Sequence, residues 1–213
     1  DEGKGKIVDW LSSEADIVVR FQGGNNAGHT IQIDKDVYKL SLLPSGIVRN
    51  KLCMIGNGVV LDPWELKKEI ETLSTQGIKI NNKNLFIAEN ITLILPFHKD
   101  IDEINERTRG SKSIGTTKRG IGPAYEDKVG RRSVRLCDLL DKENLFNKIK
   151  MLAEHHNVRF KEAKLSTINI ETVYKKILEI SKFLTPFSFP VWKLINESQD
   201  KDKKILFEGA QGS

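Results

Sequence analysis

Short apolar runs alternate with segments of helical periodicity along this chain, and this alternation constrains the fold more than any other feature of the sequence. Runs rich in β-branched and other apolar residues, typical of buried strands, occupy residues 17–21, 53–61, 85–88, 91–95 and 204–207. Apolar residues recur at helical spacing in residues 63–76, 97–109, 145–156, 170–184 and 191–198. A chain that alternates strands with helices forms an α/β fold, so we expect a mainly parallel central sheet flanked by helices.

Capping and turn residues set the bounds of several of these elements. Asp62 is suited to cap a helix, Pro63 to occupy its first position and Gly77 to end it. Residues 30–33 and 37–43 are strand-like and are separated by a short Asp-Lys-Asp turn. Two strand-like runs joined by a short turn predict a β-hairpin.

The composition is that of an ordinary globular protein. Of the 213 residues, 38% are hydrophobic and 30% are charged. The apolar runs are too short to span a bilayer, and no apolar segment follows a basic one at the start, so neither a membrane span nor a secretion signal is expected. Cys53 and Cys137 are too few for a disulfide scaffold and lack metal-ligand spacing. We therefore expect a cytoplasmic protein.

The positive charge of the chain is concentrated in one segment. Residues 107–135 contain nine basic residues against two acidic ones, a net charge of +7, whereas the other 184 residues have 25 basic and 27 acidic groups. The formal charge of +5 for the whole chain is therefore a local property. It predicts an anionic partner at this segment.

The sequence Gly-Lys-Gly-Lys at residues 3–6 precedes a helical pattern. Glycines allow a phosphate to approach the backbone, the N–H groups of a helix N-terminus point at the anion, and lysines supply charge. The segment departs from the Walker A pattern, because the first glycine is missing and Ile7 stands where Ser or Thr would bind magnesium. A basic surface turn that caps a helix is the alternative interpretation.

The segment Asn-Asn-Ala-Gly-His-Thr at residues 25–30 places one imidazole in a loop of small residues after a predicted strand. The Gly28 carbonyl is suited to bind a metal ion, and the His29 side chain is suited to donate a proton. The alternative is a turn with a surface histidine. We assign no role to His98, His155 or His156.

The segment 115–123 combines hydroxyl groups, cations and three glycines, a composition that can enclose a phosphate. A solvated basic loop is one alternative. RNA binding through the basic segment 107–135 is another, although Tyr125 is the one aromatic residue there that could stack on a base. A non-catalytic anion-binding or RNA-binding module is therefore the competing interpretation of the whole chain.

Four motifs, taken in order, resemble those of one enzyme family. They are Asp-Glu-Gly-Lys-Gly-Lys at residues 1–6, Asn-Ala-Gly-His-Thr at 26–30, Gly-Thr-Thr-Lys-Arg-Gly-Ile-Gly-Pro-Ala-Tyr-Glu-Asp-Lys at 115–128, and Phe-Glu-Gly-Ala-Gln-Gly at 207–212. Together with residues 44–47 and 55–59, they make the chain similar to the adenylosuccinate synthetases. The resemblance extends over residues 1–213, is weakest at about 145–203, and covers the first half of the family's chain.

The resemblance implies a GTP-dependent ligase of purine biosynthesis that joins IMP and L-aspartate to give adenylosuccinate, GDP and phosphate. A carboxylate removes a proton from the purine ring, the γ-phosphoryl group of GTP is transferred to the position-six oxygen of IMP, and aspartate then displaces the phosphate. The P-loop-NTPase-like fold that the resemblance implies is incomplete in this sequence.

The resemblance also implies a role for individual residues. Asp1 would be the general base and His29 the general acid, and Asp1 and the Gly28 carbonyl would bind Mg²⁺. The GTP phosphates would be bound by Glu2, Gly3, Lys4, Gly5, Lys6, Gly28, His29 and Thr30. IMP would be bound by Asp1, Lys4, Asn26, Ala27, Gly28, His29, Thr117, Arg131 and Gln211.

The implied partners are IMP, GTP, L-aspartate and a second copy of the chain, in a homodimer in which Arg131 reaches the neighbouring active site. Neither a membrane nor a nucleic acid is expected as a partner. Residues 1–213 would form the N-terminal part of one large domain, with a helical insertion at about 140–200. The residues that bind aspartate and guanine in the family lie beyond Ser213, so we expect this piece by itself to be inactive.

Overall fold

The computed structural model describes residues 4–26, 28–109 and 115–210. The chain divides into two compact units, one formed by Asp1–Ile91 with Pro186–Ser213 and the other by Thr92–Thr185. The second unit includes much of the range predicted as a helical insertion, about 140–200. The prediction that the whole chain belongs to one larger domain stays a prediction.

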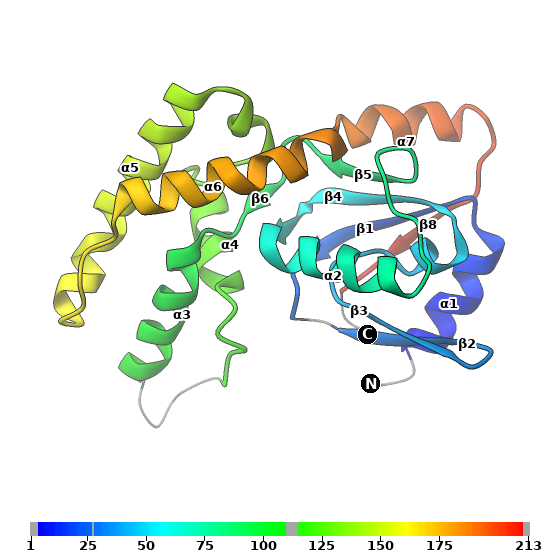
Figure 1. Cartoon of the computed structure of the whole chain (residues 1–213), viewed down its shortest axis with the longest axis horizontal. Coiled ribbons are helices and arrows are strands. Elements are labelled where there is room, and N and C mark those ends of the chain that lie inside the picture. Colours follow the sequence, from blue (N-terminus) through cyan, green and yellow to red (C-terminus); the bar gives the residue numbers. More distant parts are fainter. Residues whose placement is uncertain (1–3, 27, 110–114, 211–213) are drawn as a thin grey trace. The chain divides into compact units, whose positions relative to one another are not determined.

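The first unit is built on a parallel sheet, as the alternation of strands and helices predicts. Its strands are β1 (Ile17–Gly23), β4 (Leu52–Leu61), β5 (Leu85–Ala88), β7 (Ser188–Phe189) and β8 (Ile205–Glu208). Their order is β7-β5-β4-β1-β8, and each neighbouring pair is parallel (Figure 1). In the centre, Val18 of β1 lies opposite Cys53 of β4 and Leu206 of β8. Strands of a parallel sheet are buried on both faces, and this explains their continuous apolar runs.

The helices of the first unit are α1 (Lys4–Glu14), α2 (Pro63–Thr75) and α7 (Val191–Gln199), with a short 3-10 helix η1 (Ser45–Arg49). The predicted cap of α2 is confirmed, because Asp62 Oδ1 accepts hydrogen bonds from the N–H groups of Trp64 and Glu65. Beyond the end of α2, Gly77 has a φ of 87°, a left-handed conformation that glycine adopts at little cost.

The predicted hairpin is present as β2 (His29–Ile33) and β3 (Asp36–Leu40), which pair in antiparallel fashion. The second strand was expected to continue to Leu43 but ends at Leu40. The reason is a competing acceptor: the backbone N–H groups of residues 41–43 donate to the buried carboxylate of Glu69 on α2. A buried N–H group must have a partner, and here a carboxylate replaces a neighbouring strand.

The second unit is mainly helical. It consists of β6 (Thr92–Leu93), α3 (Pro96–Arg109), α4 (Ile121–Val129), η3 (Leu136–Leu140), α5 (Lys142–Glu162) and α6 (Ile170–Leu184), and the short η4 (Thr185–Phe187) precedes β7. The strand predicted at 91–95 is present but shorter, with only Thr92 and Leu93 in β6, and the sequence prediction did not include α4. It also underestimated α5, which begins at the Asp141 cap and is longer than the predicted 145–156.

Within the described residues, the structure contains no helix that is both long enough and apolar enough to cross a membrane.

Candidate active site

A pocket of about 570 Å³ lies between the beginning of α1 and strand β2. It is lined by Gly5, Lys6, Asp9, Thr30, Ile31, Gln32 and Asp34. The pocket therefore brings together Gly5, Lys6 and Thr30, which were predicted to bind phosphate from two separate motifs. A helix N-terminus with an adjacent lysine attracts an anion, because its first N–H groups have no partner within the helix.

The carboxylate of Asp9, which lines this pocket, forms an ion pair with Arg49. The Arg49 Nε and Nη2 atoms donate to the two oxygens of the Asp9 carboxylate, at 2.6 and 2.7 Å. These hydrogen bonds raise the pKa of Arg49. A bidentate pair of this kind fixes both side chains and removes the repulsion that an unpaired Asp9 would exert on a phosphate.

Five of the predicted site residues lie outside the described part of the chain: Asp1, Glu2, Gly3, Ala27 and Gln211. Lys4 is the first residue of α1, whereas Asn26 and Gly28 are exposed on either side of residue 27. The roles of all these residues stay predictions.

His29 is the first residue of β2, and its side chain is buried. Its Nε2 atom is 2.8 Å from the Ser45 hydroxyl oxygen and 3.4 Å from Glu208 Oε1. The backbone N–H of Ser45 donates to Glu208 Oε2 at 2.8 Å, so the three residues form one connected group. This geometry excludes the alternative in which His29 is a surface side chain of a turn.

Sequence reasoning did not assign roles to Ser45 and Glu208. Glu208 ends β8 and Ser45 begins η1, so they reach His29 from two other segments of the first unit. Both lie within motifs that resemble the family, and a polar residue at the carboxyl end of a parallel strand is a recognised signal of a site. That signal was present in the sequence at Glu208.

The segment 115–120 is anchored by acidic side chains of α3. Asp102 accepts hydrogen bonds from the Thr116 hydroxyl group and the Gly120 backbone N–H, at 3.1 and 3.0 Å, and Glu106 accepts one from the Gly115 N–H at 2.9 Å. Thr117, predicted to bind IMP, is exposed within this anchored segment. Glu103 of the same helix pairs with Arg107 at 2.6 Å, and so offsets one of the basic residues of the segment 107–135.

Arg131, also predicted to bind IMP, is exposed just after α4 and has a φ of 58°. It lies in the second unit with Thr117, whereas His29 and the pocket at α1 lie in the first. The predicted site residues that the structure describes thus form two sets, one near α1 and β2 in the first unit and one, Thr117 and Arg131, in the second.

The whole chain, residues 1–213, matches the family model described as adenylosuccinate synthetase. The chain belongs to the adenylosuccinate synthetase family. This is a family of ligases of purine biosynthesis, and its identification confirms the resemblance found in the sequence.

Solved structures support the same relationship. A fully ligated adenylosuccinate synthetase from Plasmodium falciparum matches with a TM-score of 0.86 and 35% sequence identity, over 100% of this chain and 49% of that one. A succinoaminodeoxyadenylate synthetase of cyanophage S-2L, bound to dGMP and to dATP as an energy donor, matches with a TM-score of 0.51 and 25% identity, over 72% of this chain and 44% of that one. The chain therefore spans about half the length of the solved relatives.

Gly120 and Gly122 allow a matched test of the anchored segment. Gly120 has a φ of 75°, and a Cβ there would lie 2.7–2.9 Å from His98 Cβ and from backbone atoms of His98 and Lys99. A Cβ on Gly122, in α4, would meet nothing within 4 Å. We expect Gly120→Ala to lower the free energy of unfolding by about 2 kcal/mol or more. We expect Gly122→Ala to be neutral or to raise it by up to about 1 kcal/mol. Urea titration measures both, and equal effects would contradict this geometry.

Proposed function

We propose that this chain carries part of the active site of a cytoplasmic, GTP-dependent ligase that joins IMP and L-aspartate to form adenylosuccinate, GDP and phosphate. The observation that carries the proposal is the pocket at α1, where Gly5, Lys6 and Thr30 come together beside the buried His29. Membership of the adenylosuccinate synthetase family supports the same reaction.

The GTP phosphates would bind at the N-terminus of α1. Backbone N–H groups of its first turn would donate to phosphate oxygens, Lys6 would supply positive charge, and the exposed Thr30 hydroxyl group would donate from the facing strand. Successive residues of a strand point to opposite sides. Thr30 therefore lines the pocket while its neighbour His29 points into the protein.

His29 would act as the general acid that stabilises charge on the transferring phosphoryl group. The Glu208 carboxylate and the Ser45 hydroxyl group orient its ring through Nε2. A carboxylate beside a catalytic imidazole holds the ring in position and stabilises its protonated form, as in other acid–base pairs. Asp1 would take the proton from the purine ring.

The donor set proposed for Mg²⁺ consists of the Asp1 carboxylate and the Gly28 carbonyl, and oxygen atoms of these two types suit this ion. When bound, Mg²⁺ neutralises negative charge on the phosphates and polarises the phosphoryl group. Gly28 directly precedes His29, and the resemblance assigns both residues to the site of phosphoryl transfer.

IMP would be held by Asp1, Lys4, Asn26, Ala27, Gly28, His29, Thr117 and Gln211, with Arg131 binding the IMP phosphate of the neighbouring subunit in a homodimer. Arg131 is exposed, and Val129, two residues before it, is 81% exposed. An exposed arginine is free to reach a phosphate on a second copy of the chain, as the proposed homodimer requires.

The choice of nucleotides needs direct measurement, because the cyanophage relative is bound to dGMP and dATP. Two comparisons are therefore needed. The first compares IMP with dGMP as the acceptor, and the second compares GTP with ATP or dATP as the phosphoryl donor. A preference for dGMP would contradict the proposed substrate while leaving the reaction type unchanged.

The role of His29 predicts a specific kinetic defect. We expect His29→Ala to lower kcat by about 10²–10⁴-fold, the usual contribution of a general acid, while IMP and GTP still bind. We expect Glu208→Gln, which removes the charge beside Nε2 and keeps the shape, to lower kcat by roughly tenfold with little change in KM. Glu71→Gln, on the exposed side of α2, is the control and should not change kcat.

Steady-state kinetics and nucleotide binding measured on the complete protein check these values. A His29→Ala enzyme within a few-fold of wild type would refute the acid role. An impaired His29→Ala enzyme with an unaffected Glu208→Gln enzyme would refute only the role of Glu208.

Shared active sites predict complementation between two variants that are each impaired at an IMP concentration below the wild-type KM. A hybrid dimer of Arg131→Leu and His29→Ala subunits has one site with both residues intact. Half of randomly mixed dimers are hybrids, so the mixture should recover about a quarter of wild-type activity. If the dimers exchange subunits but the mixture stays impaired, Arg131 does not act across the subunit interface.

A further inference from the structure

Three side chains of the second unit form a buried polar cluster that the proposed reaction does not use. They are His98 on α3, Asp127 on α4 and His156 on α5, and none has a side chain more than 1% exposed. The Nε2 atoms of His98 and His156 lie 3.1 and 2.8 Å from the same oxygen, Asp127 Oδ2. Buried polar groups of this kind are costly unless they are paired, so their arrangement needs an explanation.

The protons in this cluster can be assigned from the hydrogen bonds. The backbone N–H of Leu95 donates to His98 Nδ1 at 2.9 Å, so Nδ1 is an acceptor and the ring proton is on Nε2. Burial lowers the pKa of His98, and this favours the neutral ring. Burial by itself would raise the pKa of Asp127, but the hydrogen bonds from His156 and His98 outweigh it and hold that pKa well below its usual range.

This assignment distinguishes the cluster from a metal site. Two imidazoles and a carboxylate are common metal ligands, and their ligand atoms lie within 4.8 Å of one another. A metal on His98 Nε2 would need the lone pair that the proton occupies, and the Leu95 N–H prevents the proton from moving to Nδ1. The cluster is therefore a set of hydrogen bonds centred on an ionised Asp127.

Asp127 also holds the turn that follows α4. Its second oxygen, Oδ1, accepts a hydrogen bond from Arg132 Nε at 3.1 Å, and its backbone carbonyl accepts one from the Arg132 N–H at 2.9 Å. The Arg131 N–H donates to the Lys128 carbonyl at 3.2 Å. Both the main chain and the side chain of Arg132 are thus attached to one buried residue.

The conformation of Arg131 depends on this attachment. Its φ of 58° is unfavourable for a residue with a side chain and persists where the surroundings enforce it. Gly130 contributes as well, because a Cβ there would lie 2.4–2.7 Å from the Arg132 guanidinium group. The guanidinium group therefore lies directly against the Gly130 backbone, and the Arg131 side chain is directed into solvent between two fixed neighbours.

We propose that the His98–Asp127–His156 cluster, acting through Arg132, positions Arg131 for the phosphate of IMP bound to the neighbouring subunit. This proposal rests on the proposed function, in which Arg131 binds that phosphate. A flexible arginine loses rotamer and backbone freedom when it binds, and a turn fixed in advance avoids part of that loss. Asp127, His98, His156 and Arg132 are positioning residues, and they do not themselves touch the substrate.

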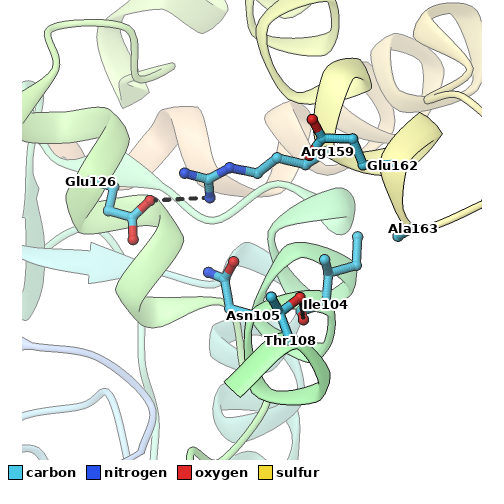
Figure 2. A pocket seen from close by; sticks show the side chains of 7 residues that line it. All are labelled: Ile104, Asn105, Thr108, Glu126, Arg159, Glu162 and Ala163. Carbon is cyan, nitrogen blue, oxygen red and sulfur yellow. Dashed lines mark hydrogen bonds and ion pairs between the residues drawn. The ribbon is translucent and has the colours of Figure 1, made fainter. Parts of the chain in front are cut away.

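A neighbouring ion pair provides a matched control. Figure 2 shows Arg159 of α5 pointing toward Glu126 of α4, at the edge of a pocket of about 540 Å³ lined also by Asn105 and Thr108. The distance between Arg159 Nη1 and Glu126 Oε2 is 3.5 Å, and both side chains are substantially exposed. An exposed pair of this kind contributes little to structure. Glu126 directly precedes Asp127, and the two pairs differ mainly in the burial of the carboxylate, which is exposed in Glu126 and buried in Asp127.

The first test is a double-mutant cycle on the complete protein, with KM for IMP as the readout. Arg132→Lys keeps the charge but loses the Nε donor, and we expect it to raise this KM roughly tenfold while kcat and the KM for GTP stay within about twofold. In an Arg131→Leu background the same substitution should cause no further change, because the residue it positions is gone. Arg159→Lys should leave all three constants unchanged.

Two further variants test the cluster without relying on Arg132 itself. Gly130→Ala removes no hydrogen-bonding group but displaces the guanidinium group, so it should raise the KM for IMP as Arg132→Lys does. His156→Leu should also raise it, whereas His156→Gln, whose amide N–H can replace Nε2–H, should restore a value near wild type.

The proposal is overturned if Arg131→Leu raises the KM for IMP but Arg132→Lys and Gly130→Ala do not. It is also overturned if the effects of Arg132→Lys and Arg131→Leu multiply in the double mutant. If Arg131→Leu itself leaves this KM unchanged, then the role of Arg131 in the proposed function is wrong, and the positioning role is wrong with it.

Discussion

The buried carboxylate of Glu208 links three segments that are far apart in the sequence, and the candidate active site of the first unit depends on it. One of its oxygens, Oε2, accepts a hydrogen bond from the Ser45 N–H, and the other, Oε1, lies 3.4 Å from His29 Nε2. The carboxylate therefore connects the end of β8 with the beginnings of η1 and β2. Burial and the nearby Glu208 raise the pKa of Cys53 well above its usual range, so this thiol stays neutral. A charge in such a dry environment constrains its neighbours strongly, because losing a partner would leave it buried and unpaired. The position of His29 follows from this constraint.

Acidic side chains position basic or catalytic groups throughout the structure. Asp9 fixes Arg49 at the pocket, Asp102 anchors the segment that contains Thr117, and Asp127 fixes Arg132. The residues that these anchors leave exposed, such as Thr117 and Arg131, are the ones assigned to substrate by the resemblance to the adenylosuccinate synthetases. Within the basic segment 107–135, Arg107 pairs with Glu103 and Arg132 with Asp127, so part of its concentrated positive charge is held in ion pairs of defined geometry.

Local patterns in the sequence predicted most of the fold, and contacts between distant residues account for most of what was missed. The cap at Asp62 and the β-branched run at β1 depend on neighbouring residues, and both predictions are confirmed. The extension of β3 to Leu43 was wrong because the N–H groups of residues 41–43 bind Glu69, a residue 26–28 positions away.

Helix α4 was missed because its glycines indicated a loop, although proline near a helix N-terminus was a signal for it. The contacts of Glu208 with Ser45 and of Asp127 with both histidines join residues 163 and 29 positions apart, and no local pattern encodes them.

The fate of the position-six oxygen of IMP tests the central claim most directly. The proposed reaction transfers the γ-phosphoryl group of GTP to that oxygen before aspartate displaces it, so the oxygen must leave with the phosphate. IMP labelled with oxygen-18 at position six should yield one labelled oxygen in each inorganic phosphate formed with adenylosuccinate, as measured by mass spectrometry. Unlabelled phosphate, or GTP hydrolysis without adenylosuccinate, would contradict the account.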